Sequence, residues 1–286
     1  MKQLELAGLP TALQHQLYID MRYQPAASNN ETGKRRLHCT IKYAARLGMI
    51  SPIFISWLYG INRSLALEHL NKLVKADLLN VAPTVRVPDG RVYVLTLAGA
   101  KLAEELLRQH VPFRSSTNPQ LQVNQNTVMH DVILQYILAR GIHNVDGEGN
   151  HRPQWTGFIS EKEFKRLYPS STIRNVDSLV IEPDGNCCAI EIEHSYKPIQ
   201  LRKSILLKYR DALQIGLYDK VFFISQSQQI LQDCKRINGV AMDSLTSIVD
   251  RKTDRPLLSD NDRKLLEDRL IYRTKFCEEI TTLFYP

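Results

Sequence analysis

Apolar residues recur at mainly helical spacing through the first part of the chain. Residues 35–47 form a basic helical segment, residues 51–59 form a short apolar one, and leucines mark one face of residues 65–78. Apolar positions three or four residues apart lie on one face of a helix. Asn62 or Ser64 can cap the third segment, because both side chains accept a hydrogen bond from a free backbone amide. The pattern predicts three consecutive helices.

The next segment, VAPTVRVPDGRVYVLT, predicts a β-hairpin. Its two β-rich runs flank the turn residues Pro88, Asp89 and Gly90, and residues 98–109 return to a helical pattern. Three helices, a hairpin and a helix form a winged helix-turn-helix, in which one helix can enter a major groove while the hairpin contacts the DNA backbone. The candidate DNA contacts are Arg63, His69, Lys72, Lys75, Arg86 and Arg91.

Polar stretches without periodicity divide the chain. The sequence AASNNETGK, around residue 30, is typical of a loop, and residues 112–126 combine proline with polar residues as interdomain linkers do. The predicted divisions are an N-terminal segment (1–33), a winged helix-turn-helix domain (34–111), a linker (112–126), a second domain (127–252) and a C-terminal helical segment (253–286).

The pattern of the second domain changes to β near its centre. Residues 173–181 and 187–193 predict two strands, which the turn sequence EPDGN joins into an antiparallel hairpin. Ser160 and Glu163 have the spacing of a capping box at a helix start. Further helices are expected at 128–139, 201–215 and 261–284, and further strands at 155–159 and 220–225. The fold class is therefore α/β (α+β), with a mixed central sheet in the second domain.

The net positive charge of the chain comes entirely from its first part. Residues 1–125 contain 15 Lys or Arg and 8 Asp or Glu, a net charge of +7, and the remaining residues balance because the whole chain is also +7. This asymmetry favours a polyanion-binding N-terminal domain, although solubility alone explains such a charge equally well. The chain has no apolar run of membrane-spanning length and no CxxC pair among its five cysteines, so we expect a cytoplasmic protein without membrane insertion.

Three acidic residues lie on the predicted hairpin of the second domain. Side chains alternate along a strand, so Glu191 and Glu193 point the same way, roughly 6 to 7 Å apart, and pairing can bring Asp177 beside them. Clustered carboxylates need a cation, and Mg²⁺ or Mn²⁺ prefers oxygen ligands. Lys203 and Lys208, on the following helix, are candidates to reach a phosphate.

Structural explanations remain for each of these acids. Glu191 and Glu193 can lie on the solvated face of a half-exposed sheet, and Asp177 can be a buried polar group with a hydrogen-bond partner. Tyr209 is expected in the core rather than as a nucleophile.

Several segments, in order, resemble the replication-relaxation family and the related MobC-type plasmid mobilisation proteins. They are GRVYVLTLAGAKLAEELL, MHDVILQYI, FISEKEF, NVDSLVIEPDGNCCAIEIEHS and LRKSILLKY, and together they cover roughly residues 35–225. The resemblance implies a winged helix-turn-helix followed by a restriction-endonuclease-like domain similar to PD-(D/E)xK nucleases. It also implies the activity of a relaxase, which nicks plasmid DNA to start its transfer.

The resemblance assigns roles to individual residues. Asp177 matches the family's Asp after the first core strand, Glu191 and Glu193 match its acidic strand, and Glu161 matches an upstream glutamate. The sequence departs from the broader nuclease pattern because Glu193 stands where that pattern has lysine. Lys203 or Lys208 can replace that lysine from the helix.

Two functions follow from these observations. The first is a metal-dependent DNA endonuclease of plasmid mobilisation, which recognises double-stranded DNA at an origin of transfer, nicks it, and works with a conjugative coupling protein. The alternative is a regulator of plasmid replication or transcription, in which a degenerate nuclease fold serves assembly. A metal requirement and the loss of cleavage on replacing Asp177 or Glu191 distinguish the two.

Overall fold

The chain folds into two compact units. The computed structural model describes residues 9–251 and 254–285. The first unit, called the helical unit below, comprises Tyr18–Gly157 and the last few residues of the chain, and the second, called the sheet unit, comprises the residues up to Leu17 together with Phe158–Thr282. No helix within the described residues is long and apolar enough to cross a membrane.

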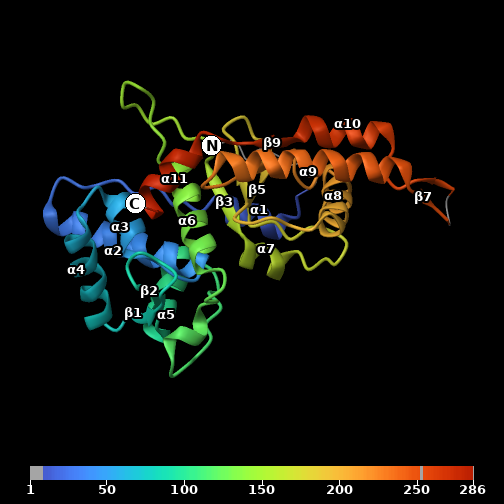
Figure 1. The fold of residues 1–286 in the computed structure, drawn as a ribbon. Helices are drawn as coiled ribbons and strands as arrows, with labels where there is room; N and C mark the ends of the chain where they lie inside the picture. The colour runs from blue at the N-terminus through green and yellow to red at the C-terminus, as the bar shows by residue number, and fades with distance from the viewer. Residues whose placement is uncertain (1–8, 252–253, 286) are drawn as a thin grey trace. The chain divides into compact units, whose positions relative to one another are not determined.

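The helical unit begins with the predicted order of three helices, a hairpin and a helix (Figure 1). Its elements are α2 (Asn29–Leu47), α3 (Pro52–Tyr59), α4 (Arg63–Lys75), β1 (Leu79–Pro83), β2 (Arg91–Leu95), α5 (Leu97–Leu107), the 3-10 turn η1 (Pro119–Gln122) and α6 (Val128–Ile142). Serine, asparagine and threonine side chains cap α2, α3, α4 and α5, each accepting a hydrogen bond from a first-turn backbone amide. These local signals make the helix starts a property of the sequence.

The polar stretch predicted as a loop around residue 30 is in fact the start of α2. The side chain of Ser28 accepts a hydrogen bond from the amide of Glu31, and α2 therefore begins at Asn29, within the predicted loop. Polarity alone led to the wrong prediction, because the capping signal Ser-x-x-Glu in this stretch was overlooked.

Strands β1 and β2 form an antiparallel hairpin in which Val81 pairs with Tyr93. Asp89, in the turn, accepts a hydrogen bond from the amide of Ile53 at the start of α3 and forms an ion pair with Arg63 at the start of α4. Gly90 follows with a φ of 67°, which a residue without a side chain adopts readily. The turn is thereby fixed to the ends of two helices.

The sheet unit is built around a mixed sheet, as the sequence predicted. Its elements are α1 (Thr11–Leu17), β3 (Gly157–Ser160), α7 (Glu161–Leu167), β4 (Ser178–Ile181), β5 (Cys187–Ile192), α8 (Ile199–Gln214), β6 (Lys220–Ile224), α9 (Gln228–Ser247), β7 (Val249–Asp250), β8 (Arg255–Pro256), α10 (Asp260–Arg269), β9 (Leu270–Tyr272) and α11 (Phe276–Phe284). Five of the described strands form the sheet in the order β3-β4-β5-β6-β9. Strands β4 and β5 are the predicted antiparallel hairpin, and α8 connects β5 to its parallel neighbour β6.

The division between the units differs from the predicted domain boundaries. Helix α6 packs against α2 and α3, so it belongs to the helical unit, although we expected the second domain to begin at residue 127. Residues 112–126 do not separate the units, because the side chain of Gln120 donates a hydrogen bond to the carbonyl of Pro83 in β1. The division falls after Gly157 instead.

The sequence predicted a helical C-terminal segment, but this segment also contributes a strand. The short strand β9 pairs in parallel with β6, with Leu270 opposite Val221, and so becomes the edge of the central sheet. The predicted boundary at residues 252 and 253 lies outside the described residues.

Candidate functional site

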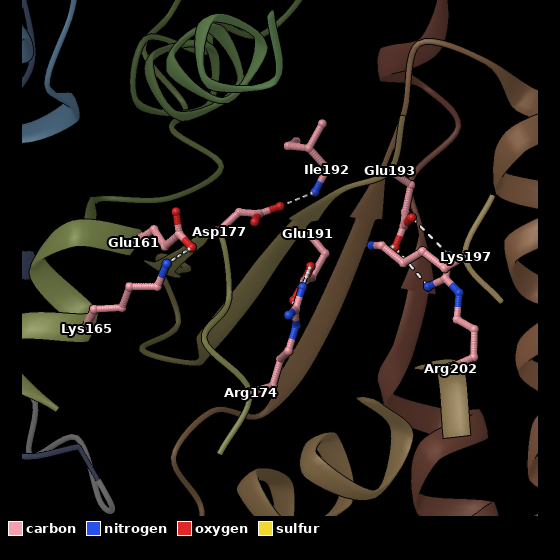
Figure 2. Close-up of polar contacts among 9 residues, drawn as sticks. All are labelled: Glu161, Lys165, Arg174, Asp177, Glu191, Ile192, Glu193, Lys197 and Arg202. Carbon is pink, nitrogen blue, oxygen red and sulfur yellow. Dashed lines mark hydrogen bonds and ion pairs between the residues drawn. The ribbon is translucent and has the colours of Figure 1, made fainter. Parts of the chain in front are cut away.

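The β4–β5 hairpin brings two acidic side chains together at the centre of the sheet unit. Ser178 pairs with Ile190, so Asp177 and Glu191 are neighbours across the two strands, and a carboxylate oxygen of Asp177 accepts a 2.7 Å hydrogen bond from the amide of Ile192. Both residues are buried, with Asp177 8% and Glu191 1% exposed. Figure 2 shows Asp177 directed towards the amide of Ile192 and Glu191 directed towards Arg174. We call Asp177 and Glu191 the acidic pair.

Glu191 is held by an arginine that the sequence analysis did not consider. Arg174, in the segment that leads into β4, donates from Nε and Nη2 to the two carboxylate oxygens of Glu191 at 3.0 and 3.1 Å. Burial and the nearby carboxylate of Asp177 raise the pKa of Glu191 to about 7, although Arg174 and Lys197 act in the opposite direction. The acidic pair therefore keeps an unfavourable interaction that the arginine does not fully offset.

Glu193 forms a separate buried ion pair just beyond the end of β5. Arg202 of α8 donates from both terminal nitrogens to its two oxygens at 2.9 Å, and Lys197 adds a 2.8 Å hydrogen bond. The Glu193 and Arg202 side chains are 1% and 3% exposed. The alternative in which Glu191 and Glu193 lie on a solvated face is therefore wrong.

The three predicted acids do not converge on one point. Figure 2 shows Glu191 and Glu193 directed to different arginines. Among the residues that the structure describes, no three His, Cys, Asp or Glu side chains are placed to hold a metal ion together. Glu193 lies just beyond the end of β5, and each buried glutamate has an arginine partner that the alternation of side chains along a strand does not predict.

The remaining candidates of the sheet unit are Glu161, Lys203 and Lys208, which take no part in the hydrogen bonds described above for the acidic pair. Glu161 begins α7 and forms an ion pair with Lys165 one turn later. Lys208 donates a 2.8 Å hydrogen bond to the carbonyl of Ser171. Lys203 is half-exposed on α8, and its position one residue after Arg202 turns its side chain by about 100° around the helix axis.

The sequence did contain a signal for the overlooked arginine of α8. The buried positions of this helix are Arg202, Ile205, Leu206, Tyr209 and Ala212, so Arg202 lies on the apolar stripe. A cation on such a stripe predicts a buried anion as its partner. Tyr209 is in the core, as expected, and burial together with the charge of Glu191 raises its pKa well above the usual value. No comparable periodicity marks Arg174, which precedes a strand.

The acidic pair supplies carboxylate oxygens, which are the type of donor that a divalent cation would need. Carboxylate oxygens are the ligands that Mg²⁺ and Mn²⁺ prefer. Asp177 and Glu191 would hold the ion once the guanidinium of Arg174 moves away from Glu191. Both oxygens of Glu193 are likewise occupied, by Arg202.

The helical unit carries exposed cations on α4 and on its hairpin. Lys72 and Lys75 lie on the outer face of α4, where Lys72 also pairs with Glu68, and Arg86 and Arg91 are exposed on the hairpin. The same face of α4 lines an open hollow of about 660 Å³. We call these four cations the basic surface.

Two further candidates of the helical unit have internal partners. Arg63 forms the ion pair with Asp89, so it supports the hairpin turn. The Nε2 atom of His69 lies 2.9 Å from the hydroxyl of Thr40, and its ring packs edge-on against Tyr59. Burial and the charge of Arg36 lower the pKa of His69 to about 4. His69 is therefore neutral and turned inward, which helical periodicity alone did not reveal.

The chain matches no family model, no curated protein and no solved structure. The geometry of the acidic pair and of the basic surface is therefore the basis for a functional proposal, together with the motifs of the sequence.

Proposed function

We propose that the protein is a DNA endonuclease of plasmid mobilisation, which binds double-stranded DNA through its helical unit and nicks an origin of transfer with its sheet unit. The observation that carries this proposal is the acidic pair, in which two buried acidic residues are neighbours, one just before β4 and one near the end of β5, and the pKa of Glu191 is raised. Perturbed, clustered acids are concentrated at functional sites because packing alone does not favour them.

The order of elements supports each half of the proposal. The helical unit has the order of a winged helix-turn-helix, with α4 as the helix that enters the major groove and β1–β2 as the wing. In the sheet unit, an acid precedes the first strand of a central hairpin, a second acid ends the next strand, and α8 then crosses to a parallel strand. This order is similar to that of the PD-(D/E)xK nucleases.

The cofactor of the proposed reaction is Mg²⁺ or Mn²⁺, held by Asp177 and Glu191. When bound, such an ion polarises a phosphodiester and activates a water molecule for attack. The protein's own contribution is to keep both carboxylates in fixed positions. The backbone amide of Ile192 orients Asp177, and the strand pairing sets its distance from Glu191.

A second candidate function is regulation of plasmid replication or transcription without cleavage. The two bidentate arginine pairs favour it, because each buried glutamate already has a cationic partner. In that case the acidic pair stabilises the fold, and the sheet unit serves in assembly.

Nicking of a supercoiled plasmid that carries the cognate origin of transfer tests the proposal. We expect open circles with Mg²⁺ or Mn²⁺ and none with EDTA. Glu191→Gln should abolish nicking while specific binding to the origin persists. Glu267→Gln, which removes an exposed carboxylate on α10, is the matched control and should nick normally. Specific binding by the wild type without nicking in either metal contradicts the proposal and supports the regulator.

A further inference from the structure

A pocket with a mixed lining, which includes the apolar residues Ile173, Leu201 and Ile205, lies beside Arg174 in the sheet unit. The segment that leads into β4 forms one wall and the outer face of α8 forms the other, and the volume of the pocket is about 360 Å³. Its polar lining consists of Ser170, Ser171, Arg174, Asn175, Ser204 and Lys208. This size is at the lower end of the range for small-ligand pockets.

The lining has the chemistry of an anion site. It contains two cations, three hydroxyl groups and one amide, and none of the lining residues is acidic. Ser204 and Lys208 are one helical turn apart on α8, so their side chains share a face. Net positive charge and several N–H and O–H donors around one small volume are what an oxygen-rich anion such as a phosphate group requires.

Both cations keep donors for a ligand. The guanidinium of Arg174 uses Nε and Nη2 for Glu191, and not Nη1, and 28% of its side chain is exposed. The ammonium of Lys208 has three N–H donors, one of which reaches the carbonyl of Ser171. A phosphate in the pocket can therefore be bound by both cations.

We propose that this pocket binds a phosphate group of the DNA backbone and that Arg174 is shared between that phosphate and Glu191. The inference rests on the proposed function, and it names the residues that position DNA beside the acidic pair. A backbone phosphate draws positive charge from Glu191 towards the pocket, which leaves the acidic pair open to a metal ion. DNA and metal then each increase the affinity for the other, because coupling between two sites is reciprocal.

The first test is binding of hexathymidylate by the full chain carrying Lys72→Gln and Lys75→Gln, which weaken the basic surface. Calorimetry should show that adding Lys208→Gln lowers the affinity about tenfold, since a hydrogen bond to a charged group contributes about 1.5 kcal/mol or more. Lys235→Gln, an exposed cation on α9, is the matched control and should leave the affinity unchanged. If the protein binds hexathymidylate equally tightly with lysine and with glutamine at position 208, the inference is wrong.

Inorganic phosphate is the second arm of the same experiment. Binding of phosphate as tightly as hexathymidylate identifies free phosphate as the ligand and overturns the assignment to DNA. Much weaker binding of phosphate supports the DNA backbone, because neighbouring nucleotides add contacts.

The third measurement is Mn²⁺ binding, followed by electron paramagnetic resonance. Hexathymidylate should increase the Mn²⁺ affinity severalfold in the wild type, and Lys208→Gln should remove this increase. Arg174→Gln should bind Mn²⁺ without needing the oligonucleotide, and Arg174→Lys serves where the glutamine variant does not fold. A Mn²⁺ affinity that is independent of the oligonucleotide overturns the sharing of Arg174.

These outcomes separate the pocket from the proposed nuclease activity. If hexathymidylate binding depends on Lys208 but the wild type does not nick DNA, the assignment of the pocket holds and the nuclease proposal is wrong. If the wild type nicks DNA but hexathymidylate binding does not depend on Lys208, the nuclease proposal holds and the assignment of the pocket is wrong.

Discussion

The basic surface of the helical unit and the buried ion pair of Arg202 with Glu193 in the sheet unit use the same kinds of charged residue in opposite ways. Lys72 and Glu68 on α4 form an ion pair in which both side chains are more than half exposed, whereas Arg202 and Glu193 form one that is almost completely buried. Water screens the first pair, so its contribution to stability is small and Lys72 can exchange its partner for another anion. The second pair has lost its water, and removing Arg202 leaves Lys197 as the remaining cation beside the buried charge of Glu193. Burial thus separates cations that can bind a ligand from cations that belong to the fold.

The largest expected effect is on the buried pair. Arg202→Leu should destabilise the protein by about 3–5 kcal/mol in urea unfolding, because Glu193 is left buried without its bidentate partner. The double variant Arg202→Leu with Glu193→Leu should recover most of this loss, since an apolar pair of similar volume needs no neutralisation. A double variant as unstable as the single one contradicts the account.

A smaller effect, dependent on pH, is expected from the acidic pair. The pKa of Glu191 is raised to about 7, so the folded protein favours its protonated form. Its stabilising contribution is therefore complete below the ordinary pKa and is lost as the pH rises through about 7. The free energy of unfolding should fall by up to about 3 kcal/mol from this group between about pH 4.5 and pH 8.

Replacement of Glu191 tests the origin of this pH dependence. Glu191→Gln should flatten the change in the free energy of unfolding, and Glu267→Gln should keep it. The measurement is urea unfolding at a series of pH values. If the free energy of unfolding changes with pH in the same way for the wild type and for Glu191→Gln, a group other than Glu191 causes the pH dependence.

Replacements at the basic surface should have the smallest effect on stability and the largest effect on DNA binding. Lys72→Gln and Lys75→Gln should each reduce the logarithmic salt dependence of DNA binding by about 0.9 and change the free energy of unfolding by less than about 0.5 kcal/mol. Fluorescence anisotropy at several salt concentrations measures the slope. Lys101→Gln, an exposed cation on α5, should change neither quantity. An unchanged slope in both α4 variants removes them from the interface.

Local signals were read well where they were sufficient by themselves. Helical spacing and capping residues predicted α3 and α4, and two Pro-Asp-Gly turns predicted both hairpins, because these elements depend on neighbours in the sequence. The same reasoning placed Glu191 on a strand of the second hairpin, but the predicted strand 173–181 is shorter in the structure and begins only after Asp177. It overlooked the cap of α2 and the strand β9, whose three residues are too few to show a period.

The site could be predicted only in part, because its partners are distant in the chain. Glu191 meets Arg174 across 17 residues, and His69 meets Thr40 across 29 residues. Neither contact leaves a periodic signal. The unit boundary after Gly157 depends in the same way on the packing of α6 against α2 and α3.

The sequence by itself determined the order of elements, the turn geometry, the placement of the acids on one hairpin and the concentration of positive charge in the first part of the chain. Only the tertiary structure decided which charges are neutralised inside the protein and which face water. The physical reason is that patterning and turn chemistry act over a few residues, whereas desolvation and ion pairing depend on which groups folding brings together. Helical spacing therefore places Arg202 on the apolar stripe of α8, but only the tertiary structure shows that Glu193 is its partner.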